Sequence, residues 1–182
     1  MPLEKKRIST QNILIEGVQF PPQLFKAHAE NNLVVFVGAG VSMGEPSSLP
    51  NFDKLAEKIA VGTYCKYDKN MSPDQFLGSL LYNNQADVHK RAANILTHSE
   101  SKPNGFHKNI CKLFENTSSL RIVTTNYDLL LEDIAFKLYP TYPPVVYSAP
   151  ALPLGDNFNG IVHLHGDVNA PQNMILTDTD FG

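Results

Sequence analysis

Two short polar segments of the sequence carry side chains that could do chemistry. Residues 124–128 read Thr-Thr-Asn-Tyr-Asp, and residues 163–167 read His-Leu-His-Gly-Asp. Each follows an apolar run, as expected where a buried strand ends. An ordinary histidine has a pKa of about 6.5, which suits proton transfer at neutral pH. His165, which precedes a glycine, is therefore a candidate general base.

Other interpretations of these segments stay open. Asn126 or Asp128 could simply cap a following helix, because both residue types are favoured at that position. His163 and His165 would point to the same face of a strand, where both could be structural or could bind a metal. Val168 stands where metallo-β-lactamase-type hydrolases have the last histidine of their HxHxDH ligand string, and no histidine follows it. We therefore expect no metal site.

A third segment, the glycine turn at residues 38–42, could bind phosphate. The apolar run Leu33–Val37 leads into Gly-Ala-Gly-Val-Ser. Glycines let backbone N–H groups approach an anion, and a helix N-terminus favours negative charge. The turn lacks the Gly-Lys-Ser/Thr of a P-loop, and Gly44 comes one residue too late for the dinucleotide fingerprint. From this motif alone, a tight turn without a ligand is an equal alternative.

Apolar runs and helical periodicity predict the elements that must position these segments. Strands are expected at residues 33–37, 120–125, 145–147, 161–164 and 174–176. Helices are expected over residues 22–31, 52–63, 73–114 in three pieces, and 129–138. This alternation predicts an α/β fold with a Rossmann-like, mainly parallel sheet flanked by helices, and a mostly helical insertion over about residues 64–117. Ligands of such sheets bind outside the carboxyl ends of the strands, where all three segments fall.

The composition is that of an ordinary globular protein, with 42% hydrophobic and 18% charged residues. The net charge of −3 does not indicate a basic surface for nucleic acid on this segment. No apolar run approaches the roughly 20 residues of a membrane span, and the basic N-terminus lacks the apolar stretch of a signal peptide. Cys65 and Cys111 form no CxxC motif, so no zinc ribbon or disulfide framework is predicted. We expect a cytoplasmic protein that does not bind a membrane.

The three segments together resemble a known family. Gly-Ala-Gly-Val-Ser, Thr-Thr-Asn-Tyr-Asp and Leu-His-Gly, in this order and each after a strand, resemble the sirtuin superfamily. The resemblance is closer to the sirtuin-like NAD-hydrolysing domains of bacterial antiviral defence systems, and it covers roughly residues 25–180. It implies an N-terminal segment over residues 1–24 and a sirtuin-like NAD-binding domain over residues 25–182. Such domains continue into another strand with a Gly-x-Ser turn, so a C-terminally truncated domain is expected.

The resemblance also implies residue roles. Asn126 would lie beside the reacting ribose of NAD and His165 would be the catalytic histidine, while Asp128 would lie near the nicotinamide amide. The other NAD-binding residues would be Gly38, Ala39, Gly40, Val41, Ser42, Pro50, Phe52, Thr124, Thr125 and Gly166. Two residues depart from the sirtuin pattern that borders the nicotinamide pocket, because Asn51 replaces an aspartate and Asp53 replaces an arginine.

The implied activity is that of an NAD+ glycohydrolase, which releases ADP-ribose and nicotinamide and depletes NAD+ in antiviral defence. NAD would be the substrate, with no metal. The implied partner is a short Argonaute, a helicase-like ATPase or a phage protein, bound through regions outside this chain, with homo- or hetero-oligomerisation.

Three other functions are weighed against the glycohydrolase. A non-catalytic module that senses NAD or an ADP-ribose derivative is the alternative. A protein deacylase is disfavoured because the four-cysteine zinc module is missing. A Rossmann dehydrogenase is disfavoured because Glu57, the acidic residue at the right distance, lies inside a predicted helix.

Overall fold

The computed structural model describes residues 12–83, 86–97, 100–155 and 158–181. The chain divides into two units, residues 1–34 and residues 35–182. This division lies later in the chain than the boundary that the sequence suggests at residues 24 and 25.

The first unit contains a hairpin and one helix. Strands β1 (Ile13–Ile15) and β2 (Val18–Phe20) pair antiparallel. Glu16 and Gly17 join them with φ values of 48° and 82°, as in the two-residue turns that match strand twist. Helix α1 (Pro22–Ala29) begins at a proline. Proline has no backbone N–H, and this costs nothing in the first turn of a helix, where the N–H groups have no partner within the helix. The helix predicted after the proline pair is confirmed.

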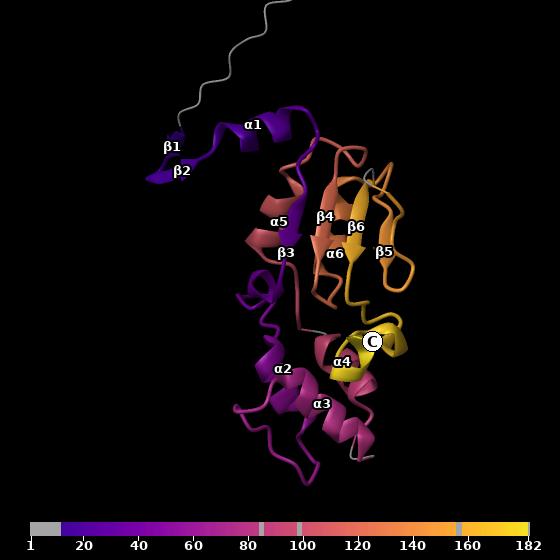
Figure 1. Cartoon of the computed structure of the whole chain (residues 1–182). Helices are drawn as coiled ribbons and strands as arrows, with labels where there is room; N and C mark the ends of the chain where they lie inside the picture. The colour runs from indigo at the N-terminus through magenta and orange to yellow at the C-terminus, as the bar shows by residue number, and fades with distance from the viewer. Residues whose placement is uncertain (1–11, 84–85, 98–99, 156–157, 182) are drawn as a thin grey trace, which may run out of the picture. The chain divides into compact units, whose positions relative to one another are not determined.

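The second unit is built on a four-stranded sheet in which all strands are parallel, in the order β3-β4-β6-β5 (Figure 1). The strands are β3 (Val35–Val37), β4 (Arg121–Thr124), β5 (Val146–Ser148) and β6 (Gly160–His163). The central strands β4 and β6 are almost wholly buried, which is why they read as continuous apolar runs. The predicted α/β fold with a mainly parallel sheet is confirmed.

The register of the sheet brings the ends of its strands to one level. Val37, Thr124, His163 and Ser148 lie side by side in adjacent strands. The segments that follow β3, β4 and β6 therefore leave the sheet next to one another. This arrangement gathers the glycine turn, the Thr-Thr-Asn segment and the His-Gly segment at the carboxyl edge.

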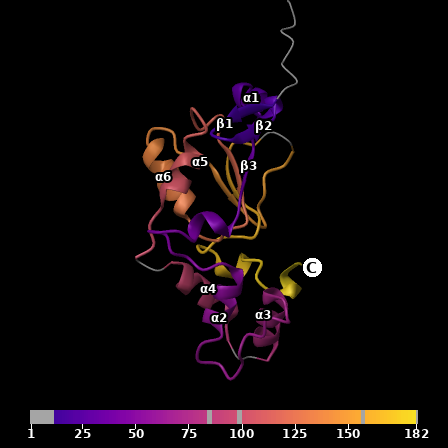
Figure 2. The same cartoon turned by 90° about the vertical axis from the view of Figure 1, so that its left-hand side faces the viewer.

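The helices of the second unit form two groups. Helices α5 (Gly105–Cys111) and α6 (Leu130–Leu138) pack together on one side of the sheet (Figure 2). Helices α2 (Phe52–Ile59), α3 (Pro73–Tyr82) and α4 (Val88–Leu96) pack on one another beyond the carboxyl ends of the strands. The expected helical insertion thus contains α3, α4 and α5, but α5 packs against α6. No helix among the described residues is long and apolar enough to cross a membrane.

Asparagine and aspartate side chains fix where several of these helices begin. Asn51 accepts a hydrogen bond from the N–H of Lys54 at 3.0 Å, and Asp87 accepts one from the N–H of Lys90 at 3.1 Å. Each bond satisfies a donor that has no partner within the helix. Asn51, which replaces the aspartate of the sirtuin pattern, therefore has a structural role as the N-cap of α2.

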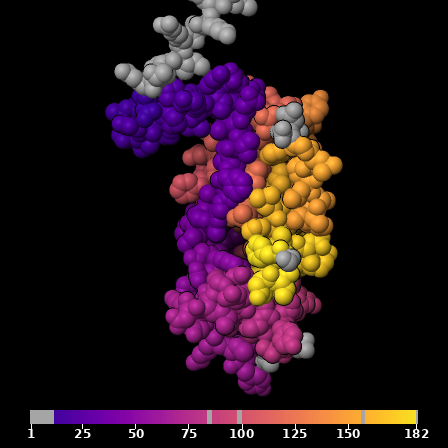
Figure 3. Space-filling model, viewed as in Figure 1, coloured from indigo at the N-terminus to yellow at the C-terminus, as the bar shows by residue number. Residues whose placement is uncertain are grey.

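The strand predicted at residues 174–176 is wrong. Met174 and Leu176 are 1% and 0% exposed, but they are buried in the apolar core of α2, α3 and α4 rather than in the sheet. Two short 3-10 helices, η2 (Pro171–Asn173) and η3 (Asp178–Phe181), flank them. In the space-filling view this C-terminal segment, residues 171–181, lies directly against the helical residues (Figure 3). A short apolar run cannot by itself distinguish these two forms of burial.

We expect Leu176→Ala to destabilise the protein by about 2–5 kcal/mol, because it leaves a cavity in a closely packed core. Leu113→Ala is the matched control, since Leu113 is 43% exposed; its cost should stay below about 1 kcal/mol. Urea unfolding of both variants measures the difference. Equal costs would show that the C-terminal segment is not part of the core.

Candidate functional site

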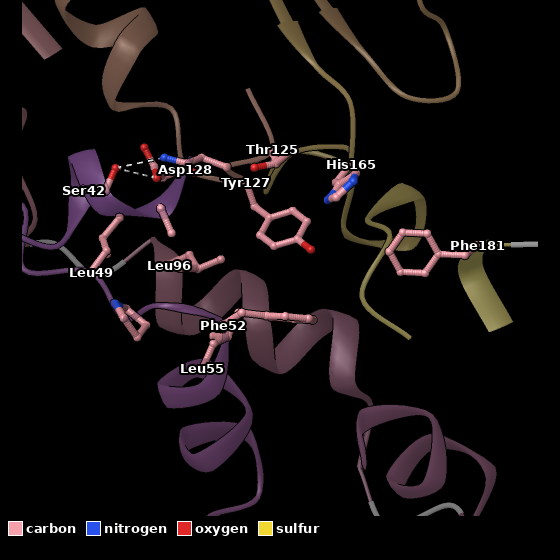
Figure 4. A pocket seen from close by; sticks show the side chains of 13 residues that line it. Ser42, Leu49, Phe52, Leu55, Leu96, Thr125, Tyr127, Asp128, His165 and Phe181 are labelled. Carbon is pink, nitrogen blue, oxygen red and sulfur yellow. Dashed lines mark hydrogen bonds between the residues drawn. The ribbon is translucent and has the colours of Figure 1, made fainter. Parts of the chain in front are cut away.

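A cavity of about 210 Å³ lies at the carboxyl ends of β3, β4 and β6 (Figure 4). Its polar side chains come from the turns that follow these strands. Its apolar side chains come from helices α2 and α4, from the loop before α2, from the turn after β3 and from the C-terminal segment. The lining residues are Ala39, Ser42, Leu49, Pro50, Phe52, Leu55, Leu96, Thr125, Asn126, Tyr127, Asp128, His165 and Phe181.

The structure brings most of the predicted site residues together around this cavity. Ala39, Ser42, Pro50, Phe52, Thr125, Asn126, Asp128 and His165 all line it. The other predicted residues, Gly38, Gly40, Val41, Thr124 and Gly166, do not line it. Gly38 and Gly40 lie on an exposed turn that opens the short 3-10 helix η1 (Ala39–Ser42).

Thr124 supports the site without reaching the cavity. Its side chain is fully buried, donates to the carbonyl of Val37 at 3.1 Å and accepts from the N–H of Asn126 at 3.0 Å. The N–H of Thr125 donates to the same Val37 carbonyl at 3.1 Å. These bonds hold the turn after β4 against the end of β3.

Asn126 is held at three of its four polar groups. Its N–H donates to Thr124, its side-chain Nδ2 donates to Ser42 Oγ at 3.2 Å, and its carbonyl accepts from His163 Nδ1 at 2.7 Å. The fourth group, Oδ1, is buried and has no hydrogen-bond partner among the described residues. The side chain is therefore fixed in orientation and presents one unpaired acceptor.

Ser42 is the centre of a buried polar network that includes His107. Ser42 Oγ donates to Asp128 Oδ2 at 3.0 Å and lies 3.1 Å from His107 Nε2. Because Ser42 Oγ gives its one proton to Asp128, it accepts from His107, so Nε2 carries a ring proton. Nδ1 lies 3.2 Å from the N–H and 2.9 Å from the side-chain Oδ1 of Asn104. Burial lowers the pKa of His107, and the charge of Asp128 only partly opposes this. His107 is therefore a neutral donor at neutral pH.

The sequence reasoning missed His107. An available signal was the N-cap pattern of α5, in which the Asn104 side chain accepts from the first turn and His107 accepts from the Asn104 N–H. That pattern predicts the start of a helix. It does not predict that the same ring contacts Ser42, which is 65 residues away in the sequence.

Asp128 contributes both to the cavity wall and to a helix start. Its Oδ1 accepts from the N–H of Leu130, the first residue of α6, at 3.1 Å. Its Oδ2 accepts from Ser42. The helix-capping alternative for this residue is thus compatible with a place in the site.

The structure separates the two histidines, because β6 ends at His163 and His165 lies in the turn beyond it. His163 is fully buried and contacts Glu132 Oε1 at 2.6 Å. Burial acts to lower the pKa of His163, but the hydrogen bond and charge of Glu132 outweigh it and raise the pKa. Among the described residues, no group of three or more His, Cys, Asp or Glu side chains could hold a metal ion.

His165 lies between two aromatic rings at the cavity. Its ring centroid is 6.4 Å from that of Tyr127 and 5.7 Å from that of Phe181, with Phe181 edge-on at 85° (Figure 4). Burial lowers the pKa of His165, so the ring is neutral at neutral pH and can accept a proton. Tyr127 and Phe181 were not predicted; Tyr127 ties this wall to the C-terminal segment by donating to the Ile175 carbonyl at 2.6 Å.

The fold and site define a parallel α/β protein with a small ligand cavity at the strand ends. Residues 120–182 match the family model of the SIR2-like domain, which confirms the sirtuin-like resemblance over this part of the chain. The match contains β4, α6, β5 and β6, with Asn126 and His165; the glycine turn lies outside it.

No curated protein matches the chain. SIR2-like domains bind NAD, so the match indicates an NAD-related function and is compatible with an NAD-utilising enzyme. The antiviral-defence type stays a prediction.

Gly166 is required by the backbone beside His165, and we expect Gly166→Ala to be strongly destabilising. Its φ is +77°, and an added Cβ would lie 2.5 Å from the carbonyl oxygen of Asn173. Gly62 has a similar φ of +78° with open space around it, so Gly62→Ala is the matched control. The control should cost about 1–2 kcal/mol for backbone strain, and Gly166→Ala on the order of 3 kcal/mol. Urea unfolding tests this; equal costs would contradict the close approach.

Proposed function

We propose that this cavity hydrolyses NAD+ to ADP-ribose and nicotinamide, and that the protein is an effector that depletes NAD+ in antiviral defence. The observation that carries the proposal is the unpaired Oδ1 of Asn126. A buried acceptor without a partner costs about 1–3 kcal/mol. A ribose hydroxyl or the attacking water would supply the missing donor, so the cost is recovered when the substrate binds.

The chemistry needs one fixed acceptor and one base. Water attacks C1′ of the ribose while the C1′–nitrogen bond breaks, and the bonding electron pair leaves with nicotinamide, which becomes neutral. The proton lost by the water passes to His165, whose lowered pKa keeps it neutral and able to accept. General base assistance of this kind is worth about 10²–10⁴-fold in rate. Asn126 Oδ1 orients the water or the ribose.

The size of the cavity indicates which part of NAD+ would lie inside it and which part outside. At about 210 Å³ it is smaller than the roughly 300–1,000 Å³ of pockets that enclose a whole ligand of drug size. We assign the nicotinamide ribose to the cavity, against the apolar side chains of Leu49, Phe52 and Leu96. The pyrophosphate would lie outside it, along the exposed turn at Gly38 and Gly40, where backbone N–H groups are accessible to an anion.

We expect Asn126→Ala and His165→Ala each to reduce nicotinamide release from NAD+ by on the order of 10²-fold or more, because one removes the fixed acceptor and the other the base. The assay is chromatographic detection of nicotinamide from the purified protein under activating conditions. His28→Ala is the control, because it removes an exposed histidine of α1 that does not line the cavity, and its rate should equal that of the parent.

Two results would count against the proposal. If both site variants release nicotinamide at the parent rate, the residue assignment is wrong. If the parent protein binds NAD+ and returns it unchanged, the site is a sensing module rather than a hydrolase. The defence role needs a separate measurement, in which phage challenge should lower cellular NAD+ with the parent protein but not with Asn126→Ala.

The rate should also depend on pH through His165. A base must be neutral, and burial lowers the pKa of His165, so kcat/KM should stay constant as pH falls to about 6.5 and decline only below it. The residual activity of His165→Ala should lack this acid limb. An acid limb centred clearly above pH 6.5 would contradict the assignment of His165 as the base.

A further inference from the structure

The buried pair of Glu132 and His163 is not used by the proposed chemistry. Glu132 comes from α6 and is 4% exposed, and His163 ends β6 and is 0% exposed. Neither lines the cavity. Burial of two ionisable side chains is costly unless they are paired and hydrogen-bonded, so their position calls for an explanation.

The hydrogen-bond partners of His163 define its protonation state. Nδ1 lies 2.7 Å from the backbone carbonyl of Asn126, and Nε2 lies 2.6 Å from the Glu132 carboxylate. A carbonyl and a carboxylate are both acceptors only. The carbonyl can only accept, so Nδ1 donates and carries a proton. A second proton lies between Nε2 and Oε1, and the raised pKa of His163 places it on the ring, which makes the ring an imidazolium and Glu132 its counter-charge.

The bond from Nδ1 reaches the residue that carries the proposed function. The N–H of Asn126 is fixed by Thr124 and its Nδ2 by Ser42, so His163 supplies the remaining anchor. We propose that Glu132 and His163 are positioning residues, a buried carboxylate–imidazolium pair that fixes the Asn126 carbonyl and thereby the direction of its free Oδ1. The kinetic effect of this inference rests on the proposed function. The charge state of the pair is independent of that function.

The groups around His163 favour its charged form. Glu132 on α6 makes the direct contact, and Asp167 in the turn after β6 adds a second negative charge. The Cys111 thiol on α5 faces Glu132, and burial raises its pKa to about 12, so it stays neutral. Burial of His163 opposes these effects, but the net result is a raised pKa.

Two double variants isolate the bond to Asn126. On a Glu132→Gln background, which avoids an unpaired buried carboxylate, His163→Asn places an amide donor where Nδ1 lies and can still reach the Asn126 carbonyl. His163→Gln on the same background places the amide where Nε2 lies and loses that bond. The two proteins differ in a single methylene group and share every other change.

The measurement is steady-state NAD+ hydrolysis together with urea unfolding. We expect the His163→Gln form to lose on the order of 100-fold in kcat, with KM changed by less than about threefold, and the His163→Asn form to recover most of that loss. Similar unfolding midpoints for the two forms would confirm that the difference is positional. Equal losses of kcat that follow equal losses of stability would overturn the proposal and make the pair purely structural.

A second measurement does not require activity. In 15N-labelled protein, both ring nitrogens of His163 should be protonated at neutral pH by NMR, and the single Glu132→Gln variant should show one unprotonated nitrogen. Because the pKa is raised, the charged ring persists below about pH 6.5 and is lost only as pH rises through the raised value. A neutral His163 in the parent protein at pH 6.5 overturns the inference. An imidazolium in a protein that releases no nicotinamide upholds the pair and refutes only the proposed function.

Discussion

Three hydrogen bonds hold Asn126, and each comes from a different part of the sheet. Thr124 is on β4, Ser42 follows β3, and His163 ends β6. The parallel order β3-β4-β6 is therefore a requirement of the site, because only adjacent strands with aligned ends can reach one residue from both sides. The same bonds explain how the side chain can keep an unpaired Oδ1, since rotation to find a partner would break contacts already made.

Two fully buried histidines support Asn126, and their partners explain why His107 is neutral and His163 is positively charged. His107 meets the N–H and the side-chain oxygen of Asn104 on one nitrogen and the Ser42 hydroxyl on the other, and burial keeps its ring neutral. His163 meets the Asn126 carbonyl on one nitrogen and the Glu132 carboxylate on the other, and a charged ring donates to both. Burial lowers the pKa of each, and the carboxylate of Glu132 reverses the outcome for His163 alone. The residue type was visible in the sequence, but the partner that sets its charge was not.

The fold could be predicted because its signals are local. The apolar runs that became β4 and β6 are buried on both faces, and the helix starts at Asn51 and Asp87 are marked by capping residues. The strand predicted at residues 174–176 failed because burial against helices and burial in a sheet select the same apolar residues. A local sequence pattern indicates whether a segment is buried, but it does not identify the elements against which the segment packs.

The candidate site was predictable to the extent that it follows from strand ends. Asn126, Asp128 and His165 line the cavity because each directly follows a strand in one parallel sheet. His107 and Phe181 come from α5 and from the C-terminal segment, and no spacing rule relates them to β3 or β6. Their contacts depend on how the helices pack, which a single sequence does not specify.

The two residues proposed for catalysis are held by different parts of the second unit. Asn126 is anchored to the sheet, whereas His165 contacts the C-terminal segment, through its carbonyl to the N–H of Ile175 at 2.8 Å and through its ring to Phe181. That segment is in turn packed on α3 and α4 and tied to His89 by Asp180 at 3.0 Å. A shift of the C-terminal segment would therefore displace the base while leaving the acceptor in place, so the separation between the two depends on the packing of the helices against the sheet.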